Sequence, residues 1–223
     1  MGLQASDWAT LREMIQNFLY QIPEEVSSKD STFVRWTGLT QKMLEANWDA
    51  GGMLTSCNAF AGKIAQEIGV PRKSVLAKGA LDISQAEKEV PGCWQDANSA
   101  EACRDHLTPQ AGDIYSSWTK VKYKGQEWIQ KWGHVGVVYS FEDDGTWWLI
   151  QGGQGGPGSR IDYIRWKNAK FDRTKINGWV DIAKYLMPTD PLGHSEPTSI
   201  SRRDSCVPAG HGWVGPGPVE LAP

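Results

Sequence analysis

The hydrophobic pattern of this chain changes its period near residue 110. Before that point, apolar residues recur every three or four positions, as in helices that bury one side. After it, apolar and polar residues alternate, as in strands. Helices followed by strands do not supply the repeated strand–helix units of a parallel sheet. The pattern therefore predicts an α+β fold with N-terminal helices packed on a central antiparallel sheet.

Three helices are predicted in the first seventy residues. The first begins after a suitable N-cap at Ser6 and ends before Pro23. The second covers residues 31–48, and the third opens within residues 55–62 and stops at Gly69.

Five short strands are predicted beyond residue 110. They cover residues 114–118, 127–132, 134–141, 146–151 and 160–166. The sequence Asp143-Asp144-Gly145 predicts a hairpin turn between two of them. We expect one domain over residues 1–187, and a separate tail over 188–223 because seven of the twelve prolines lie there.

The charge balance and the hydropathy of the chain exclude two classes of partner. The chain has 23 basic and 26 acidic residues and a formal net charge of −3, without the basic excess of a phosphate-backbone binder. It has no run of 18 apolar residues, so we expect no membrane insertion. The first fourteen residues lack the basic and apolar regions of a signal peptide.

The four cysteines are too few and too unevenly spaced for a disulfide scaffold. Cys93, Cys103 and His106 supply three possible zinc ligands, but no fourth ligand is evident. A short disulfide-closed loop and two plain thiols are the alternatives. We therefore predict no metal and no cofactor.

Cys57, His134 and Gln151 are the candidate catalytic residues. Cys57 lies at a predicted helix start, where free N–H groups favour a thiolate and can donate hydrogen bonds to an oxyanion. His134 begins an apolar strand and is the best-placed base. Gln151 ends the next strand and can orient the imidazole, with Gln154 as competitor because strand register decides which side chain shares the face.

Four segments resemble the NlpC/P60 cysteine peptidases in their order along the chain. Residues 55–62, Thr-Ser-Cys-Asn-Ala-Phe-Ala-Gly, resemble the nucleophile helix, usually Asp-Cys-Ser-Gly-Phe. Residues 107–115 resemble the Pro-Gly-Asp-Leu segment, and residues 133–138 resemble the His-Val-Gly-Ile-Tyr strand. Residues 149–152 fall where that family carries its third polar residue. The related CHAP amidases share this core.

The resemblance implies a papain-like fold over residues 1–187, with a helical part (1–50) and a catalytic core (51–187), that hydrolyses amide bonds in peptidoglycan stem peptides. Cys57 would attack the carbonyl, His134 would act as base and then acid, and Gln151 would orient it. Ser56 replaces the usual Asp, and Trp48 is the nearest match to an upstream Tyr.

Twelve tryptophans are an unusually large number for a chain of 223 residues. Most are expected to fill the sheet core. Trp132 neighbours His134 in the sequence and is predicted to line a groove. The substrate-binding candidates are Trp48, Trp132 and Gln154. The glycine-rich run at 152–156 lacks the Lys-Ser/Thr of a phosphate loop and predicts a rim loop.

A cell-wall hydrolase without a signal peptide needs another delivery route. The short chain and single catalytic domain resemble antibacterial effectors of type VI secretion, which are made in the cytoplasm and act in a target cell's periplasm. That resemblance implies a secretion-system component and a cognate immunity protein as partners; a phage lysin shares these features. The alternatives are an effector that modifies proteins (a deamidase, transglutaminase-like enzyme or protease) and a binding module without turnover.

Overall fold

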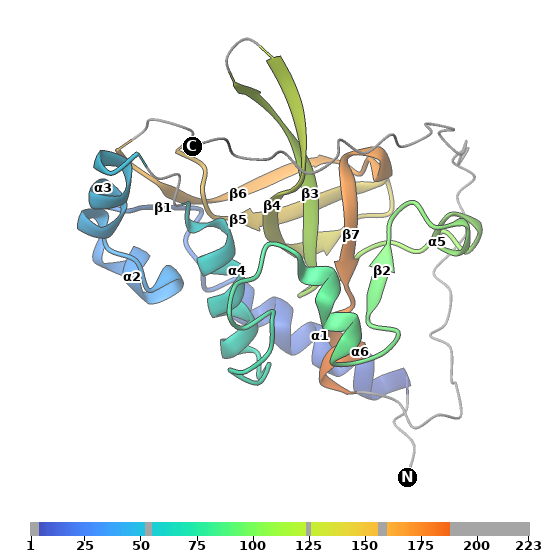
Figure 1. The fold of residues 1–223 in the computed structure, drawn as a ribbon. Coiled ribbons are helices and arrows are strands. Elements are labelled where there is room, and N and C mark those ends of the chain that lie inside the picture. Colours follow the sequence, from blue (N-terminus) through green and yellow to red (C-terminus); the bar gives the residue numbers. More distant parts are fainter. Residues whose placement is uncertain (1–4, 52–54, 124–125, 156–159, 188–223) are drawn as a thin grey trace.

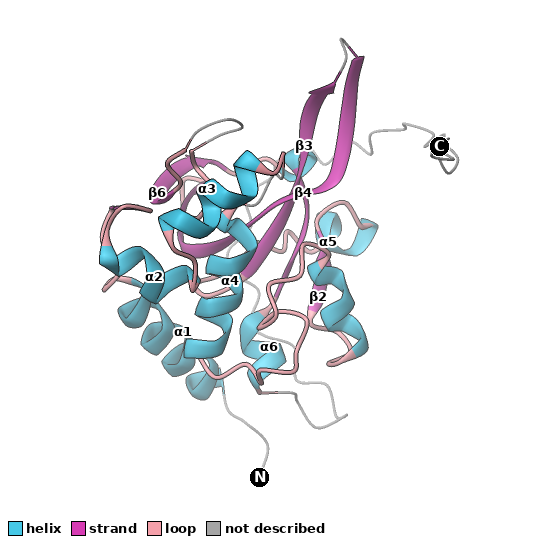
Figure 2. Ribbon diagram, turned by 60° about the vertical axis from the view of Figure 1, so that its left-hand side comes forward, coloured by secondary structure: helices cyan, strands magenta, loops and turns pink. Residues whose placement is uncertain are grey.

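A computed structural model describes residues 5–51, 55–123, 126–155 and 160–187. In these residues the fold is α+β, with an antiparallel sheet of seven strands and helices gathered on one of its faces (Figures 1 and 2). The strand order is β1-β6-β5-β4-β3-β7-β2. The predicted α+β class and antiparallel sheet are confirmed.

The helices and strands have the following bounds. The helices are α1 (Ala5–Leu19), α2 (Ser31–Thr37), α3 (Gln41–Asp49), α4 (Ser56–Glu67), α5 (Ala100–Arg104) and α6 (Ile182–Leu186), with 3-10 helices η1 (Ile83–Lys88) and η2 (Arg173–Lys175). The strands are β1 (Glu25–Ser27), β2 (Trp94–Asp96), β3 (Ile114–Tyr123), β4 (Gln126–Phe141), β5 (Thr146–Gln151), β6 (Tyr163–Lys170) and β7 (Ile176–Val180).

The single helix predicted over residues 31–48 is wrong, because two caps divide it. Gly38 adopts a left-handed conformation (φ 71°) at the end of α2 and donates its N–H to the carbonyl of Val34. Thr40 then caps α3, and its Oγ1 accepts from the N–H of Met43 at 3.2 Å. Both short helices pack on the same core, so the apolar period runs through the break. The third helix forms as predicted. The first also forms, but it begins at Ala5, so Ser6 lies inside α1 and is not its N-cap.

The two strands predicted over 127–132 and 134–141 are one strand, β4. Gly133 does not break it: a Cβ there would lie 2.6 Å from Cβ of Thr119 on the paired β3, so this glycine permits a close approach. The pairing also contains an irregularity between Ser117 and Thr119. β3 extends to Tyr123, and the strand predicted at 160–166 is shifted to 163–170. The turn at 143–145 and the strand at 146–151 are confirmed.

Three strands were not predicted. β1 and β2 each have three residues, precede residue 110 and add to the two edges of the sheet, so the expectation that all strands follow the helices is wrong. β7 pairs with both β3 and β2. Such short segments carry no alternating pattern, and only pairing with a neighbouring strand makes them strands.

The sheet buries side chains on both faces. The main core lies between the sheet and the helices, where Phe60 and Ile64 of α4 meet Val135 and Val137 of β4. A smaller cluster on the opposite face contains Tyr115, Val138, Trp147 and Leu149. Because side chains alternate along a strand, His134 and Gln151 lie on this second face.

Asp113 anchors the start of β3. Its buried carboxylate accepts hydrogen bonds from the N–H of Gln110 (2.8 Å) and of Ile182 (3.0 Å) and forms an ion pair with Arg12 of α1. Arg12 also pairs with Asp181 at 2.7 Å. Burial raises the pKa of Asp113. It ties α1 and α6 to the sheet.

The predicted tail at 188–223, with Cys206, His194 and His211, lies outside the described residues. Among the helices of the described part, none combines the length and the apolar character needed to span a membrane.

Candidate active site

Cys57 lies in the first turn of α4. Thr55, the N-cap residue, has an extended backbone, and its Oγ1 is hydrogen-bonded to Sγ of Cys57 at 3.1 Å. The Cys57 side chain is buried, with 4% of its surface exposed. α4, which carries Cys57, packs on the main-core face of β4, whereas His134 of β4 lies on the opposite face.

Ser56 fastens the loop that follows Gln151 to this helix turn. Its Oγ accepts a 2.7 Å hydrogen bond from the N–H of Gly153, and its own N–H donates to Oδ2 of Asp162 at 2.8 Å. A Cβ at Gly152 would lie 2.6 Å from the carbonyl oxygen of Ser56. The loop therefore contacts the turn that contains Cys57.

Asp162 supplies the carboxylate that the residue before Cys57 lacks. Its other oxygen, Oδ1, accepts from the N–H of Tyr163, and its own N–H donates to Oγ of Ser28 at 3.0 Å. An acidic group beside a helix N-terminus satisfies the free N–H groups of the first turn. A residue more than a hundred positions away thus caps the α4 helix, and no local sequence pattern reports it.

His134 extends from β4 on the face opposite the main core. The imidazole is half-buried and meets the ring of Tyr115 edge-on, with the ring centroids 6.3 Å apart. Its Nε2 is buried and has no hydrogen-bond partner among the described residues. Burial, and secondarily the charge of Lys167, lower the pKa of His134 to about 4. The imidazole is therefore neutral at pH 7 and is less basic than an ordinary histidine.

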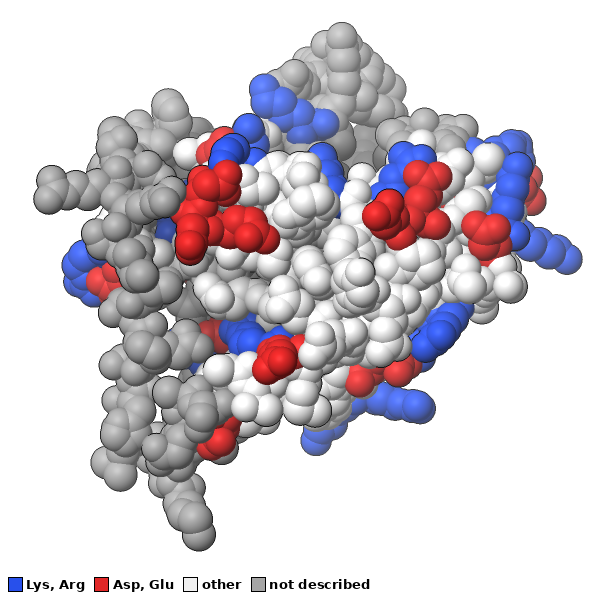
Figure 3. All heavy atoms as spheres, turned by 180° about the vertical axis from the view of Figure 1, so that it is seen from behind, with Lys and Arg blue, Asp and Glu red and all other residues white. Residues whose placement is uncertain are grey.

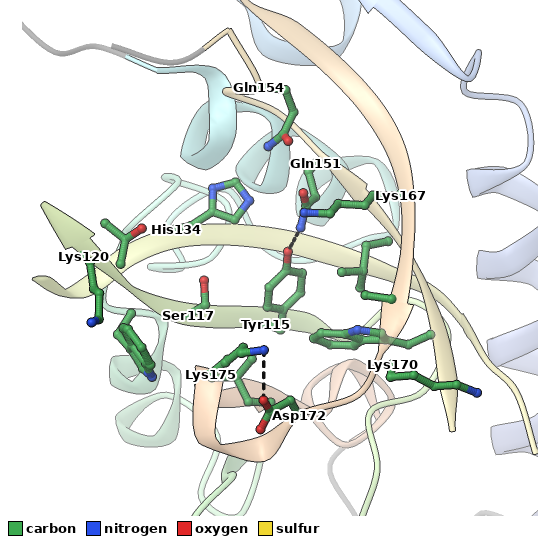
Figure 4. Close-up of a pocket in the computed structure, with 16 residues that line it drawn as sticks. Tyr115, Ser117, Lys120, His134, Gln151, Gln154, Lys167, Lys170, Asp172 and Lys175 are labelled. Atoms are coloured by element: carbon green, nitrogen blue, oxygen red, sulfur yellow. Dashed lines mark hydrogen bonds and ion pairs between the residues drawn. The ribbon is translucent and has the colours of Figure 1, made fainter. Parts of the chain in front are cut away.

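Gln151 ends β5 with only 6% of its surface exposed. Its side-chain Nε2 donates a hydrogen bond to the hydroxyl of Tyr115, which fixes the amide and leaves Oε1 as the acceptor (Figure 4). Burial raises the pKa of Tyr115, so its hydroxyl keeps its proton.

Tyr115 was not among the site residues predicted from the sequence. A signal was present in the strand pairing: Tyr115 lies opposite Gly136 in the register, and a Cβ at Gly136 would lie 2.6 Å from the tyrosine ring. A glycine inside an apolar strand indicates that another group lies directly against the backbone, but the identity of that group depends on register.

His134, Gln151 and Gln154 line the same open cavity of about 480 Å³ on the second face of the sheet (Figure 4). Nε2 of Gln154 donates to the carbonyl of Gly152 at 3.2 Å, so this side chain folds back on its own loop. Cys57 is not among the residues that line the cavity, and within the described part of the chain no hydrogen bond joins its Sγ to His134.

The two tryptophans proposed to bind substrate lie elsewhere. Trp48 of α3 packs, partly buried, against the main core. Trp132 packs edge-on against Trp94, with ring centroids 6.2 Å apart. The tryptophans that line the cavity are Trp118 and Trp147. The irregular pairing around Trp118 changes which residues of β3 and β4 share a face, which sequence spacing does not reveal.

The alternative zinc site is not assembled. No disulfide joins Cys93 to Cys103, and no three metal-binding side chains lie together in the residues that the structure describes. Burial raises the pKa of Cys93 to about 12, so that thiol stays protonated. Of the glycine-rich run, residue 156 lies outside the described part.

Comparison of the chain with protein-family models, with curated proteins and with solved structures found no match in any of the three. The side chains of this site are therefore the basis for assigning a function.

Proposed function

We propose that this chain is a papain-like cysteine hydrolase of the NlpC/P60 type, which cleaves an amide bond in peptidoglycan stem peptides. The main support is the hydrogen bond between Gly153 and Ser56, which holds the loop after Gln151 against the Cys57 turn. It brings together segments about a hundred residues apart, at the edge of the face that carries His134.

The proposed reaction has two steps. His134 takes the proton of the Cys57 thiol as sulfur attacks the carbonyl carbon, so that a C–S bond forms. The C–N bond then breaks, and the imidazolium gives its proton to the leaving amine. Water next attacks the thioester with His134 as base, which releases the carboxylic acid and restores the thiol.

Gln151 is the proposed orienting group. Its Nε2 donates to the Tyr115 hydroxyl, so its Oε1 remains available to accept a hydrogen bond from an imidazole N–H. The partnerless Nε2 of His134 is the matching donor. Because Sγ of Cys57 contacts Thr55 in the structure, attack requires this side chain to turn from Thr55 toward the imidazole.

The test is mass spectrometry of purified peptidoglycan digested with the protein. We expect new stem-peptide fragments with the wild type and with Cys103→Ala, and none with Cys57→Ala. The fragments also identify the bond that is cut. Intact wall with folded wild-type protein would contradict the proposal and favour an effector that modifies proteins.

We also propose that the chain acts as an antibacterial effector in a target cell's periplasm, with a secretion-system component and an immunity protein as partners. The support is the proposed cell-wall chemistry. We expect growth arrest when an added signal peptide directs the protein to the periplasm of a Gram-negative host, and normal growth when it stays in the cytoplasm. Equal toxicity in both compartments would contradict a site of action in the periplasm.

A further inference from the structure

The cavity beside His134 is rich in lysine although the chain as a whole is slightly acidic. Its charged lining consists of Lys120, Lys167, Lys170, Lys175 and one acid, Asp172. Carboxylates already neutralise two of these lysines: Lys175 pairs with Asp172 at 3.1 Å, and Lys170 pairs with Asp144 at 2.6 Å.

Lys167 differs from Lys170 and Lys175. Its side chain is exposed, and it forms no ion pair with any residue in the described part of the chain. It extends from β6 toward Gln151, and its charge lowers the pKa of His134 (Figure 4). Lys167, which forms no ion pair among the described residues, therefore lies within electrostatic reach of His134, the proposed base.

The other walls of the cavity are aromatic. Tyr115, Trp118 and Trp147 line it, and Nε1 of Trp118 donates to the carbonyl of Thr174 at 2.7 Å, which fixes that indole. Fixed aromatic faces suit the planar amide groups of a peptide. A peptide that also carries a carboxylate would satisfy both the aromatic walls and Lys167.

We propose that this cavity is a subsite for a carboxylate-bearing peptide, in which Lys167 binds a carboxylate next to the amide that is cut. The inference rests on the proposed function for the position of that amide. It narrows the substrate class to acidic peptides with a free carboxylate near the scissile bond.

The arrangement of charge does not favour a nucleic acid. A phosphate chain needs a continuous basic track along its length. On the face seen in Figure 3, lysines and arginines lie beside acidic residues around a broad uncharged area. The cavity offers a local positive charge, which matches one or two carboxylates.

The test is isothermal titration calorimetry with the Cys57→Ala protein, which cannot turn substrate over by the proposed mechanism. The probes are a synthetic stem tetrapeptide with free carboxylates and the same peptide with carboxamides in their place. We expect the carboxamide form to bind about tenfold more weakly, the loss of one charge-assisted hydrogen bond. Lys167→Gln should lose the same factor, and Lys167→Arg should retain most of the affinity. Lys73→Gln, an exposed lysine beyond the end of α4, is the matched control.

Equal affinity for both peptides, no binding of either, or full affinity in Lys167→Gln would overturn the subsite. Equal competition by a short single-stranded oligonucleotide would also overturn it, in favour of a phosphate ligand. Selective binding of the acid form with intact wall in the digestion would support the subsite while the hydrolase proposal fails. If the protein cleaves the wall but Lys167→Gln binds the acid peptide with full affinity, the hydrolase proposal is supported and the subsite fails.

Discussion

The backbone N–H of Gly153 donates a 2.7 Å hydrogen bond to Oγ of Ser56, and through it the end of β5 is attached to the first turn of α4. Ser56 precedes the proposed nucleophile, and Gly153 follows the proposed orienting residue by two positions. This contact between a helix start and a strand end therefore helps to place Cys57 relative to Gln151.

Ser56→Ala should loosen this contact. It leaves the N–H of Gly153 without its acceptor, which destabilises the fold by about 1–3 kcal/mol. We expect urea denaturation to show this loss and wall digestion to slow. Ser84→Ala, which removes a hydroxyl bonded only to nearby Asp82, should change neither measurement. Unchanged activity in Ser56→Ala would mean that the contact does not position the site.

Gly153→Ala and Gly92→Ala form a matched pair, because both glycines have positive φ angles (74° and 83°). An added Cβ should destabilise each by about 1–2 kcal/mol through backbone strain. At Gly153 the Cβ would also lie 3.3 Å from Cβ and N of Cys57, whereas at Gly92 nothing lies within 4 Å. We expect similar thermal shifts, with reduced digestion only for Gly153→Ala. Equal rates of wall digestion by the two variants would show that the Gly153 loop does not position the catalytic residues.

His134 should make the stability of the fold depend on pH. Its pKa is about 4 in the folded protein against an ordinary 6.5, so the unfolded chain binds the proton more readily. The stabilisation is complete above pH 6.5 and is lost as pH falls toward 4, by up to about 3 kcal/mol. We expect the unfolding free energy of His134→Gln to fall less than that of the wild type over this interval. Parallel pH profiles would show that His134 is not held neutral.

His134, Gln151 and Gln154 should differ in their importance for turnover. We expect His134→Ala to abolish wall digestion, and Gln151→Ala to reduce it less, since an orienting group is only partly essential. Gln154→Ala should have the smallest effect because its side chain bonds to its own loop. If Gln154→Ala is more damaging than Gln151→Ala, Gln154 is the orienting residue.

Tyr115→Phe should act through Gln151. The change removes the hydroxyl that accepts from the Gln151 amide and leaves the ring over Gly136. Because the tyrosine does not touch the reacting bond in the proposed mechanism, we expect kcat to fall several-fold with KM nearly unchanged. In Gln151→Ala the same tyrosine change should have no additional effect. Additive losses would mean that Tyr115 acts independently of Gln151.

The sequence by itself determined the features whose causes are local. The change of period near residue 110 predicted the α+β class, and Asp143 to Gly145 predicted the hairpin before β5. Each of these depends on residues within a few positions of one another.

Only the tertiary structure decided which distant residues meet. It joined Gly133 into one long β4, supplied Asp162 to the start of α4, placed Tyr115 on Gln151 and brought Lys167 near His134. Pairing register and the close approach of β5 to α4 set these contacts, and both depend on the packing of the whole sheet. A pattern along the chain can identify a residue suited to a role, but its partner is fixed only when the sheet forms.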